Sequence, residues 1–336
     1  MARITLKDVA KAAGVSETTV SLVLNKKNHR ISDETVLRVE KTAKELNYTP
    51  NRIARSLATK TSAVIALIFP DIVNPYFPSL AKRITQEALS HDYGTMLINY
   101  DCKYDKEPLS ILQSGAVDGA LLVTRDYGLF ESQVPAIKNI PVVLLEPSNN
   151  MRPNSSVISS DFYAGAFEAT SWLLSNGHSS IACLTGPQDI LVAKLRLDGM
   201  LDAMKCFGLK MPSKNIIPSE FSMEAGYSAA DVVKKLKVTA VVCNSDFAAF
   251  GLIKGLNEKG IRVPEDVSIF GYDDLTMGAF TTPSLSTVGL HTDSVSTLAT
   301  RHLIDLITDP ETEPLQTFLQ PKVILRGSTS KRIFKN

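Results

Sequence analysis

The sequence predicts a small all-α helix-turn-helix headpiece at the amino terminus, followed by a larger α/β core of two lobes with doubly wound parallel sheets. Three observations predict this fold class. Short amphipathic helical patterns with tight turns fill the first 60 residues, apolar strands alternate with helical segments from Thr61 onward, and this alternation occurs as two successive series. With 336 residues, 44% of them hydrophobic, the chain is long enough for more than one core.

The first two helices are short and closely spaced. Thr5, followed three residues later by Asp8, is typical of a helix amino terminus with an acidic partner. Gly14 ends that helix, and Ser16 caps the next one after a three-residue turn. Helices joined this tightly must cross steeply, which is the geometry of a helix-turn-helix. The residues expected to face inward are Leu6, Val9, Ala10, Ala13, Val20, Val23 and Leu24.

A third helix and a short connecting segment complete this region. The third helix starts at Ser32 and buries Val36, Val39, Ala43 and Leu46. After it, Pro50 precedes a possible helix of one or two turns, in which Ile53 and Leu57 share one face. A helix this short is not stable alone.

The outward face of the second helix carries Glu17, Thr18, Ser21 and Leu22, side chains that could reach base edges in a DNA major groove. A solvated surface is the alternative for any single helical hairpin. Charge favours the DNA interpretation, because residues 1–60 hold 12 Lys and Arg against 6 Asp and Glu, a balance of +6, whereas the remainder holds 24 against 29, a balance of −5.

The α/β region begins with a buried strand at Ala63–Phe69. Further strands are expected at 96–99, 120–123 and 142–145 in the first series and at 181–184, 240–243 and 267–270 in the second. Helices are expected from Asn74, over 164–174 and over 193–206. Two such series predict two lobes with a cleft between them, and ligands of these sheets bind beyond the carboxyl ends of the strands.

Polar residues follow several of these strands. Singly, each could be a turn or helix cap, because Asp, Asn and Ser favour such positions. Together with an arginine and aromatic rings at one rim, they suit a polyhydroxylated ligand, which needs hydrogen bonds to neighbouring hydroxyls and a flat apolar surface. The residues are Asp71, Glu146, Asn244-Ser245-Asp246 and Tyr272-Asp273-Asp274.

Several other classes lack sequence support. No run of about 18 apolar residues predicts a membrane span, and no apolar signal stretch opens the chain, so we expect a cytoplasmic protein. The four cysteines have no paired spacing and favour free thiols, most of them buried. No two glycines are separated by one residue, no G-x-S-x-G occurs, and the five histidines are isolated, which argues against a dinucleotide enzyme, an esterase and a metal site. We expect no enzyme activity, no cofactor and no metal.

The segment from Ile4 to Lys60, with TLKDVAKAAGVSETTVSLVLN and ELNYTPNRIARSL, resembles the headpiece and hinge of the lactose repressor/galactose repressor family of bacterial transcription factors. The motifs DIVNPYF, the Asp118-Gly119 pair, SNGHSSIACLTGP, LRLDGM and VPEDVSIFGYDD resemble that family's core, which is similar to periplasmic sugar-binding proteins. The resemblance implies a headpiece at 1–47, a hinge at 48–61 and an effector-binding, dimerising core at 62–336. The lobes would comprise about 62–161 with 291–321, and about 162–290 with 322–331.

Matched residue by residue, the resemblance implies effector contacts from both lobes. Ser245 stands where many relatives carry an amide, Glu146 where some carry Asp, and Gly289-Leu290 where relatives usually show a basic residue and Gln. The implied effector-binding residues are Asp71, Tyr76, Phe77, Glu146, Arg196, Phe221, Ser245 and Asp273.

The same matching implies a DNA interface on the headpiece and hinge. Most relatives have Arg where this chain has Leu22, so Leu22 either meets a thymine methyl group, leaves that base pair unread, or merely packs. Leu57 could insert between base pairs in the minor groove and kink the duplex. The implied DNA-binding residues are Thr5, Ser16, Glu17, Thr18, Thr19, Ser21, Leu22, Asn25, His29, Tyr48, Asn51, Ala54, Leu57 and Lys60.

These features predict a transcriptional repressor controlled by a small effector. Two recognition helices require two copies, hence a homodimer on near-palindromic operator DNA, and the tail shows no heptads for a tetramer. Effector binding would shift the hinge between ordered and disordered states. A carbohydrate effector fits the polar set best; the alternatives are a purine or nucleoside, a protein corepressor, or a role as an activator.

Overall fold

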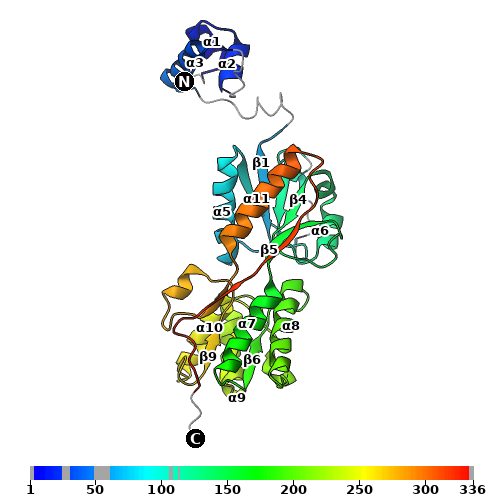
Figure 1. Ribbon diagram of the computed structural model, residues 1–336, viewed down its shortest axis with the longest axis vertical. Coiled ribbons are helices and arrows are strands. Elements are labelled where there is room, and N and C mark those ends of the chain that lie inside the picture. Colours follow the sequence, from blue (N-terminus) through cyan, green and yellow to red (C-terminus); the bar gives the residue numbers. More distant parts are fainter. Residues whose placement is uncertain (1–3, 25–30, 49–60, 106–108, 113, 333–336) are drawn as a thin grey trace. The chain divides into compact units, whose positions relative to one another are not determined.

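The computed structural model describes residues 4–24, 31–48, 61–105, 109–112 and 114–332. The predicted DNA contacts Asn25, His29, Asn51, Ala54, Leu57 and Lys60 therefore lie outside the described residues. The chain divides into two compact units, residues 1–62 and 63–336 (Figure 1), and each is described by itself.

The amino-terminal unit contains three helices: α1 (Leu6–Ala13), α2 (Glu17–Leu24) and α3 (Asp33–Glu45). Thr5 caps α1 through a reciprocal pair of hydrogen bonds with Asp8, in which the Thr5 amide donates to Asp8 Oδ2 over 2.8 Å. Gly14 ends α1 with φ +66°, a conformation that glycine adopts at little cost. The Ser16 hydroxyl accepts from the Thr19 amide over 3.0 Å and so caps α2. The predicted caps of the first two helices are confirmed.

The core of this unit is as predicted. Val9, Val20 and Val39 are fully buried, and they pack with Ala10, Ala13, Val23 and Ala43. Leu6, Leu24, Val36 and Leu46 pack against this cluster while half-buried. A core this small depends on every member, because removing methyl groups leaves cavities that few neighbours can fill.

The first lobe of the larger unit is built on a six-stranded parallel sheet in the order β11-β5-β4-β3-β1-β2. Its helix α5 (Tyr76–Ser90) packs against α11 (Thr292–Thr308), and the two lie side by side in Figure 1. The strands are β1 (Val64–Phe69), β2 (Gly94–Asn99), β3 (Gly119–Leu122), β4 (Val142–Leu144), β5 (Ser156–Ser160) and β11 (Gln316–Leu319); the shorter helices are η1 (Ser110–Leu112), α6 (Tyr127–Gln133) and η2 (Pro135–Asn139).

The second lobe has a four-stranded parallel sheet in the order β7-β6-β8-β9. Two pairs of helices, α7 with α8 and α9 with α10, pack closely. The strands are β6 (Ile181–Leu184), β7 (Ile216–Ile217), β8 (Ala240–Cys243) and β9 (Ser268–Phe270); the helices are α7 (Phe162–Ser175), α8 (Leu191–Cys206), η3 (Ser213–Asn215), α9 (Met223–Leu236), α10 (Asp246–Glu258) and η4 (Thr276–Ala279). An antiparallel pair, β10 (Thr287–Gly289) with β12 (Lys322–Ile324), lies against α7.

Two predicted lobes with parallel sheets are thus confirmed, as are all seven predicted strands. The chain passes between the lobes three times, after β5, after β10 and after β11. All four cysteines are free and most are buried, as expected: Cys102, Cys183 and Cys243 are buried, whereas Cys206 at the end of α8 is exposed. Over the described ranges, no helix combines the length and apolar character needed to cross a bilayer.

Candidate functional site: a recognition helix and an interlobe cleft

The exposed side of α2 presents Glu17, Thr18 and Leu22, and Leu22 is 38% exposed. Thr19 and Ser21 are half-buried beside them. Ser16 Oγ and Thr19 Oγ1 lie 2.9 Å apart, so the cap hydrogen bond orders the start of this face. An apolar Leu22 on an otherwise polar helix surface is partly available for contact with another surface, and both the base-contact prediction and the packing alternative for it stay predictions.

Tyr48, a predicted DNA contact of the hinge, is held against the headpiece. Its amide donates to the Ala43 carbonyl over 2.8 Å, and its ring packs half-buried against the headpiece core. Tyr48 therefore packs with the headpiece helices.

A cavity of about 220 Å³ lies between the lobes of the larger unit. Four predicted effector residues line it: Asp71, Phe77, Glu146 and Phe221. The first three come from the first lobe, where they follow β1, begin α5 and follow β4, and Phe221 precedes α9 of the second lobe. The other lining residues are Pro70, Asn74, Asp101, Val123, Thr124, Arg125, Ile190, Val192, Glu220 and Ser222.

Arg196 of α8 is the central group behind this cavity. It is 4% exposed, its Nη2 lies 3.3 Å from Asp273 Oδ1, and its Nη1 donates to the Asn244 carbonyl. Its guanidinium lies over the rings of Tyr272, Phe162 and Phe221 at 4.1, 4.8 and 5.6 Å from their centroids. Its Nε has no hydrogen-bond partner among the described residues, although it is buried. A buried donor of this kind is available to a ligand.

Two buried carboxylates share the charge of Arg196. Burial raises the pKa of Glu146 to about 7, against the opposing effect of Arg196, and the Tyr76 hydroxyl hydrogen-bonds to this carboxylate. Burial likewise raises the pKa of Asp273 to about 7, again opposed by Arg196. Because Glu146 and Tyr76 belong to the first lobe and Arg196 and Asp273 to the second, this cluster joins the two lobes electrostatically.

Ser245 has a structural role. It is 1% exposed, and its hydroxyl accepts from the Ala248 amide over 3.1 Å, which caps α10. The helix-cap alternative therefore describes Ser245, whereas its predicted effector contact stays a prediction. At Gly289-Leu290, the Leu290 carbonyl accepts a hydrogen bond from the Ser160 hydroxyl, so a side-chain to main-chain contact occupies that place.

The sequence reasoning missed a second polar cluster at the cleft. Arg125 Nε lies 2.6 Å from Asp101 Oδ2, and both residues line the cavity. Across the cleft, Asp189 of the second lobe binds Lys103 Nζ over 2.9 Å, and its carbonyl accepts from Asn149 over 2.7 Å. The signal was present, because Thr124-Arg125-Asp126 follows β3 just as Asp71 follows β1.

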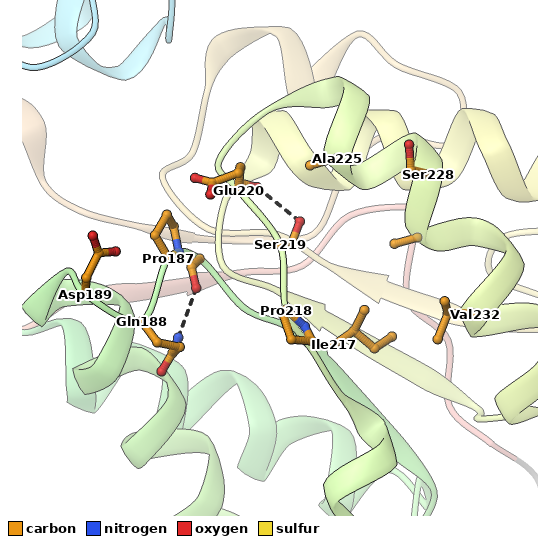
Figure 2. A pocket seen from close by; sticks show the side chains of 12 residues that line it. Pro187, Gln188, Asp189, Ile217, Pro218, Ser219, Glu220, Ala225, Ser228 and Val232 are labelled. Atoms are coloured by element: carbon orange, nitrogen blue, oxygen red, sulfur yellow. Dashed lines mark hydrogen bonds between the residues drawn. The ribbon is translucent and has the colours of Figure 1, made fainter. Parts of the chain in front are cut away.

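A larger depression of about 790 Å³ lies on the second lobe beside β7 and α9 (Figure 2). It is lined by small and apolar side chains such as Pro187, Ile217 and Ala225, and none of the predicted effector residues is among them. Two of its polar side chains are engaged locally, since Gln188 donates to the Gly186 carbonyl and Ser219 to the Glu220 carbonyl, and the Asp189 carboxylate pairs with Lys103 of the first lobe. The smaller interlobe cavity is the better candidate, because buried charged groups from both lobes converge there.

No group of His, Cys, Asp and Glu among the described residues has the arrangement of a metal site. The buried His178 is engaged within the second lobe: one ring nitrogen lies 3.0 Å from Thr239 Oγ1 and the other 2.9 Å from the Ser330 carbonyl.

Comparison with known proteins gives a consistent result. Residues 5–51 match the family described as bacterial regulatory proteins, lacI family, and residues 170–329 match the periplasmic binding protein-like domain. The ribose operon repressor of Escherichia coli K12 is 32% identical over 331 residues, covering 96% of this chain and 99% of the repressor. The transcriptional repressor PurR of Pasteurella multocida is 32% identical over 336 residues, with 98% and 99% covered.

The fold has a close counterpart among solved structures. The lac repressor dimer, bound to operator and the anti-inducer ONPF, matches with a TM-score of 0.82 and 25% identity, covering 98% of this chain and 99% of that one. A small helical unit followed by a two-lobed α/β core is therefore the architecture of both proteins.

Proposed function

Because this chain belongs to the lacI family of bacterial regulatory proteins, we propose that it represses transcription by binding operator DNA under the control of a small effector held between its lobes. It is a transcriptional regulator and not an enzyme. We infer that the effector is a sugar or sugar derivative. We also infer that the protein acts as a cytoplasmic homodimer on a near-palindromic operator, since two recognition helices need two half-sites.

The observation that carries the proposal is the buried cluster of Glu146, Arg196 and Asp273 beside the interlobe cavity. Carboxylates accept hydrogen bonds from hydroxyl groups, the free Arg196 Nε can donate one, and Phe77 and Phe221 offer apolar surface for C–H groups. Since the cluster joins both lobes, a ligand bound there changes the relative stability of their arrangements.

A purine or nucleoside is the second candidate. The rings of Phe77 and Phe221 at the cavity would stack on a base, and a PurR repressor is among the relatives with 32% identity. Among the described residues, no feature of the cleft favours a role as an activator or the use of a protein corepressor.

We propose that α2 reads the operator in the major groove. Thr18 and Ser21 would contact base edges or phosphates, and Leu22 would meet a thymine methyl group. The proposed DNA-binding residues are the same as those expected from the sequence: Thr5, Ser16, Glu17, Thr18, Thr19, Ser21, Leu22, Asn25, His29, Tyr48, Asn51, Ala54, Leu57 and Lys60. Of these, Asn25, His29, Asn51, Ala54, Leu57 and Lys60 lie outside the described residues.

The test is a DNA-binding titration at fixed salt concentration across a library of sugars, sugar derivatives, purines and nucleosides, with an operator chosen by selection from random sequence. Fixed salt is essential, because phosphate contacts make the affinity depend steeply on salt. A sugar that shifts operator affinity, and loses that effect in Arg196→Met, is the expected result. A protein that selects no discrete palindrome would contradict the proposal.

A further inference from the structure

The cations at the interlobe cleft are already paired with carboxylates. Arg125 binds Asp101 at 2.6 Å, Lys103 binds Asp189 at 2.9 Å, and Arg196 lies 3.3 Å from Asp273. Arg125 also has the Asp189 carboxylate 4.0 Å away on the opposite lobe. The positive charge that an anionic ligand would require is therefore neutralised before the ligand arrives.

The wall of the cavity carries a surplus of negative charge. Its ionisable lining residues are four carboxylates, Asp71, Asp101, Glu146 and Glu220, and one guanidinium, Arg125. Among the described residues, Asp71 and Glu220 are exposed and form no ion pair, whereas Glu146 is buried and has a pKa raised to about 7, so it is mostly ionised only above that pH. Above pH 7, a phosphate or carboxylate in this space would meet like charges on Glu146 in the buried wall and on Asp71 and Glu220 at the exposed rim.

The same cleft offers hydrogen-bond donors and acceptors to neutral ligand groups such as hydroxyls. Arg125 Nη1, in the cavity lining and 4.0 Å from Asp189 Oδ1, is a buried donor without a hydrogen-bond partner among the described residues, and so is Nε of Arg196, which lies behind the lining. Arg125 Nε donates a hydrogen bond to Asp101, which fixes the direction of the remaining N–H groups of the guanidinium. A hydroxyl group can accept from such a donor and at the same time donate to Glu146 or Asp71, which an anionic oxygen cannot do.

The volume of the cavity limits the size of the ligand. Its 220 Å³ lies below the roughly 300–1,000 Å³ of sites that enclose drug-sized ligands. Resting on the proposed effector function, we propose that this cleft selects an uncharged polyhydroxylated molecule of monosaccharide size and rejects its phosphorylated and carboxylated forms. Arg125 binds a ligand oxygen, and the carboxylates of Asp71 and Glu146 set the charge selectivity.

Matched ligand pairs test the charge rule directly. Calorimetry on the full-length protein compares D-ribose with ribose 5-phosphate, D-glucose with glucuronate, and inosine with inosine 5′-phosphate. The neutral member of any pair that binds should do so about tenfold or more tightly than the anionic member, as one unscreened carboxylate contact suffices for that ratio. An anionic member that binds equally well or better would overturn the proposal.

The outcomes separate this proposal from the sugar proposal. Binding of inosine alone supports the charge rule and contradicts a sugar effector, whereas binding of ribose 5-phosphate or glucuronate alone supports a sugar derivative and overturns the charge rule. Binding by no member of any pair contradicts both.

Single substitutions then assign the selectivity to residues. At pH 8, above the pKa of about 7 of Glu146, Asp71→Asn and Glu146→Gln keep the side-chain shape and should each reduce the neutral-to-anionic affinity ratio about threefold or more. Asp92→Asn is the matched control, because Asp92 is an exposed first-lobe carboxylate outside the cavity lining, with φ +64°, which Asn tolerates. Arg125→Gln should weaken binding of the neutral member; unchanged affinity in this variant would remove Arg125 from the ligand site.

Discussion

Replacing Arg196 with Met should destabilise the second lobe, and by more at pH 8 than at pH 6. Arg196 is the only described cation in contact with the buried Asp273, and it also offsets the charge of Glu146. Methionine retains apolar contact with the surrounding rings but removes the positive charge. Breaking a buried ion pair by removing one partner costs about 3–5 kcal/mol, because the remaining charge is left without compensation.

The pH dependence follows from the carboxyl groups. Glu146 and Asp273 have folded-state pKa values of about 7, above their ordinary values, so each holds its proton more strongly in the folded protein. Each carboxyl therefore makes the folded state less stable as the pH rises from its ordinary value to about 7. Arg196 lowers both pKa values; without it the unfavourable range extends to higher pH, and the loss of stability grows with pH.

The single tryptophan of the chain provides the assay. Trp172 lies on α7 in the second lobe, with its ring 6.3 Å from that of Phe270, so its fluorescence reports on the lobe that holds Arg196. Urea unfolding at pH 6 and pH 8 compares the variant with wild type. Arg262→Met serves as control, because that residue makes a solvent-exposed i,i+4 ion pair with Asp266, and exposed pairs contribute little to stability. Equal losses at the two pH values, or a loss no larger than that of the control, would refute the role given to Arg196.

Three further predictions concern the recognition helix, the hinge and the second-lobe packing. Leu22→Arg should create a guanine preference worth about 1–3 kcal/mol at one base pair, measured by operator selection; an unchanged preference would mean that Leu22 faces no base. Leu57→Ala should weaken specific binding far more than nonspecific binding in salt-matched titrations, and equal losses would exclude insertion of this side chain between base pairs. Gly251→Ala would place a Cβ 1.9 Å from the Met223 carbonyl oxygen, so we expect a loss of about 1–3 kcal/mol or more in Trp172-monitored unfolding, against which Gly208→Asn, at an open position with φ +70°, is the control.

The apolar strands were predictable because a strand buried on both faces consists of a continuous run of apolar residues. Ile181–Leu184 and Ala240–Cys243 were predicted residue for residue. Of the edge strands, β2 and β9 were predicted, whereas β7 and β11 were missed; the central strand β5, with the mostly polar sequence SVISS, was missed as well. β11, with the sequence QTFL, alternates between exposed and half-buried residues at the edge of the first sheet, and it pairs with a strand more than 150 positions earlier.

The candidate site was predictable in part for a similar reason. Asp71 and Glu146 directly follow apolar strands, so strand prediction alone placed them at the rim. Arg125 follows a strand as well and could have been found in the same way, but its ion pairs with Asp101 and, across the cleft, with Asp189 join residues far apart in the sequence. The cap role of Ser245 also required coordinates, since Ser is equally suited to capping and to binding a ligand.

The strand β1 links the interlobe cavity to the residue at which the chain enters the core. Ala63 adopts φ +51° just before this strand, and its amide donates to Asp118 Oδ2 over 2.8 Å, so the Asp118-Gly119 pair fixes where the chain enters the first lobe. Six residues later β1 ends at Phe69, and Asp71 beyond it lines the effector cavity. One central strand, paired on both sides, therefore connects the entry point of the chain with the lining of the cavity. Displacement of Asp71 by a ligand has, through this strand, a direct covalent route to the residue at which the chain enters the first lobe.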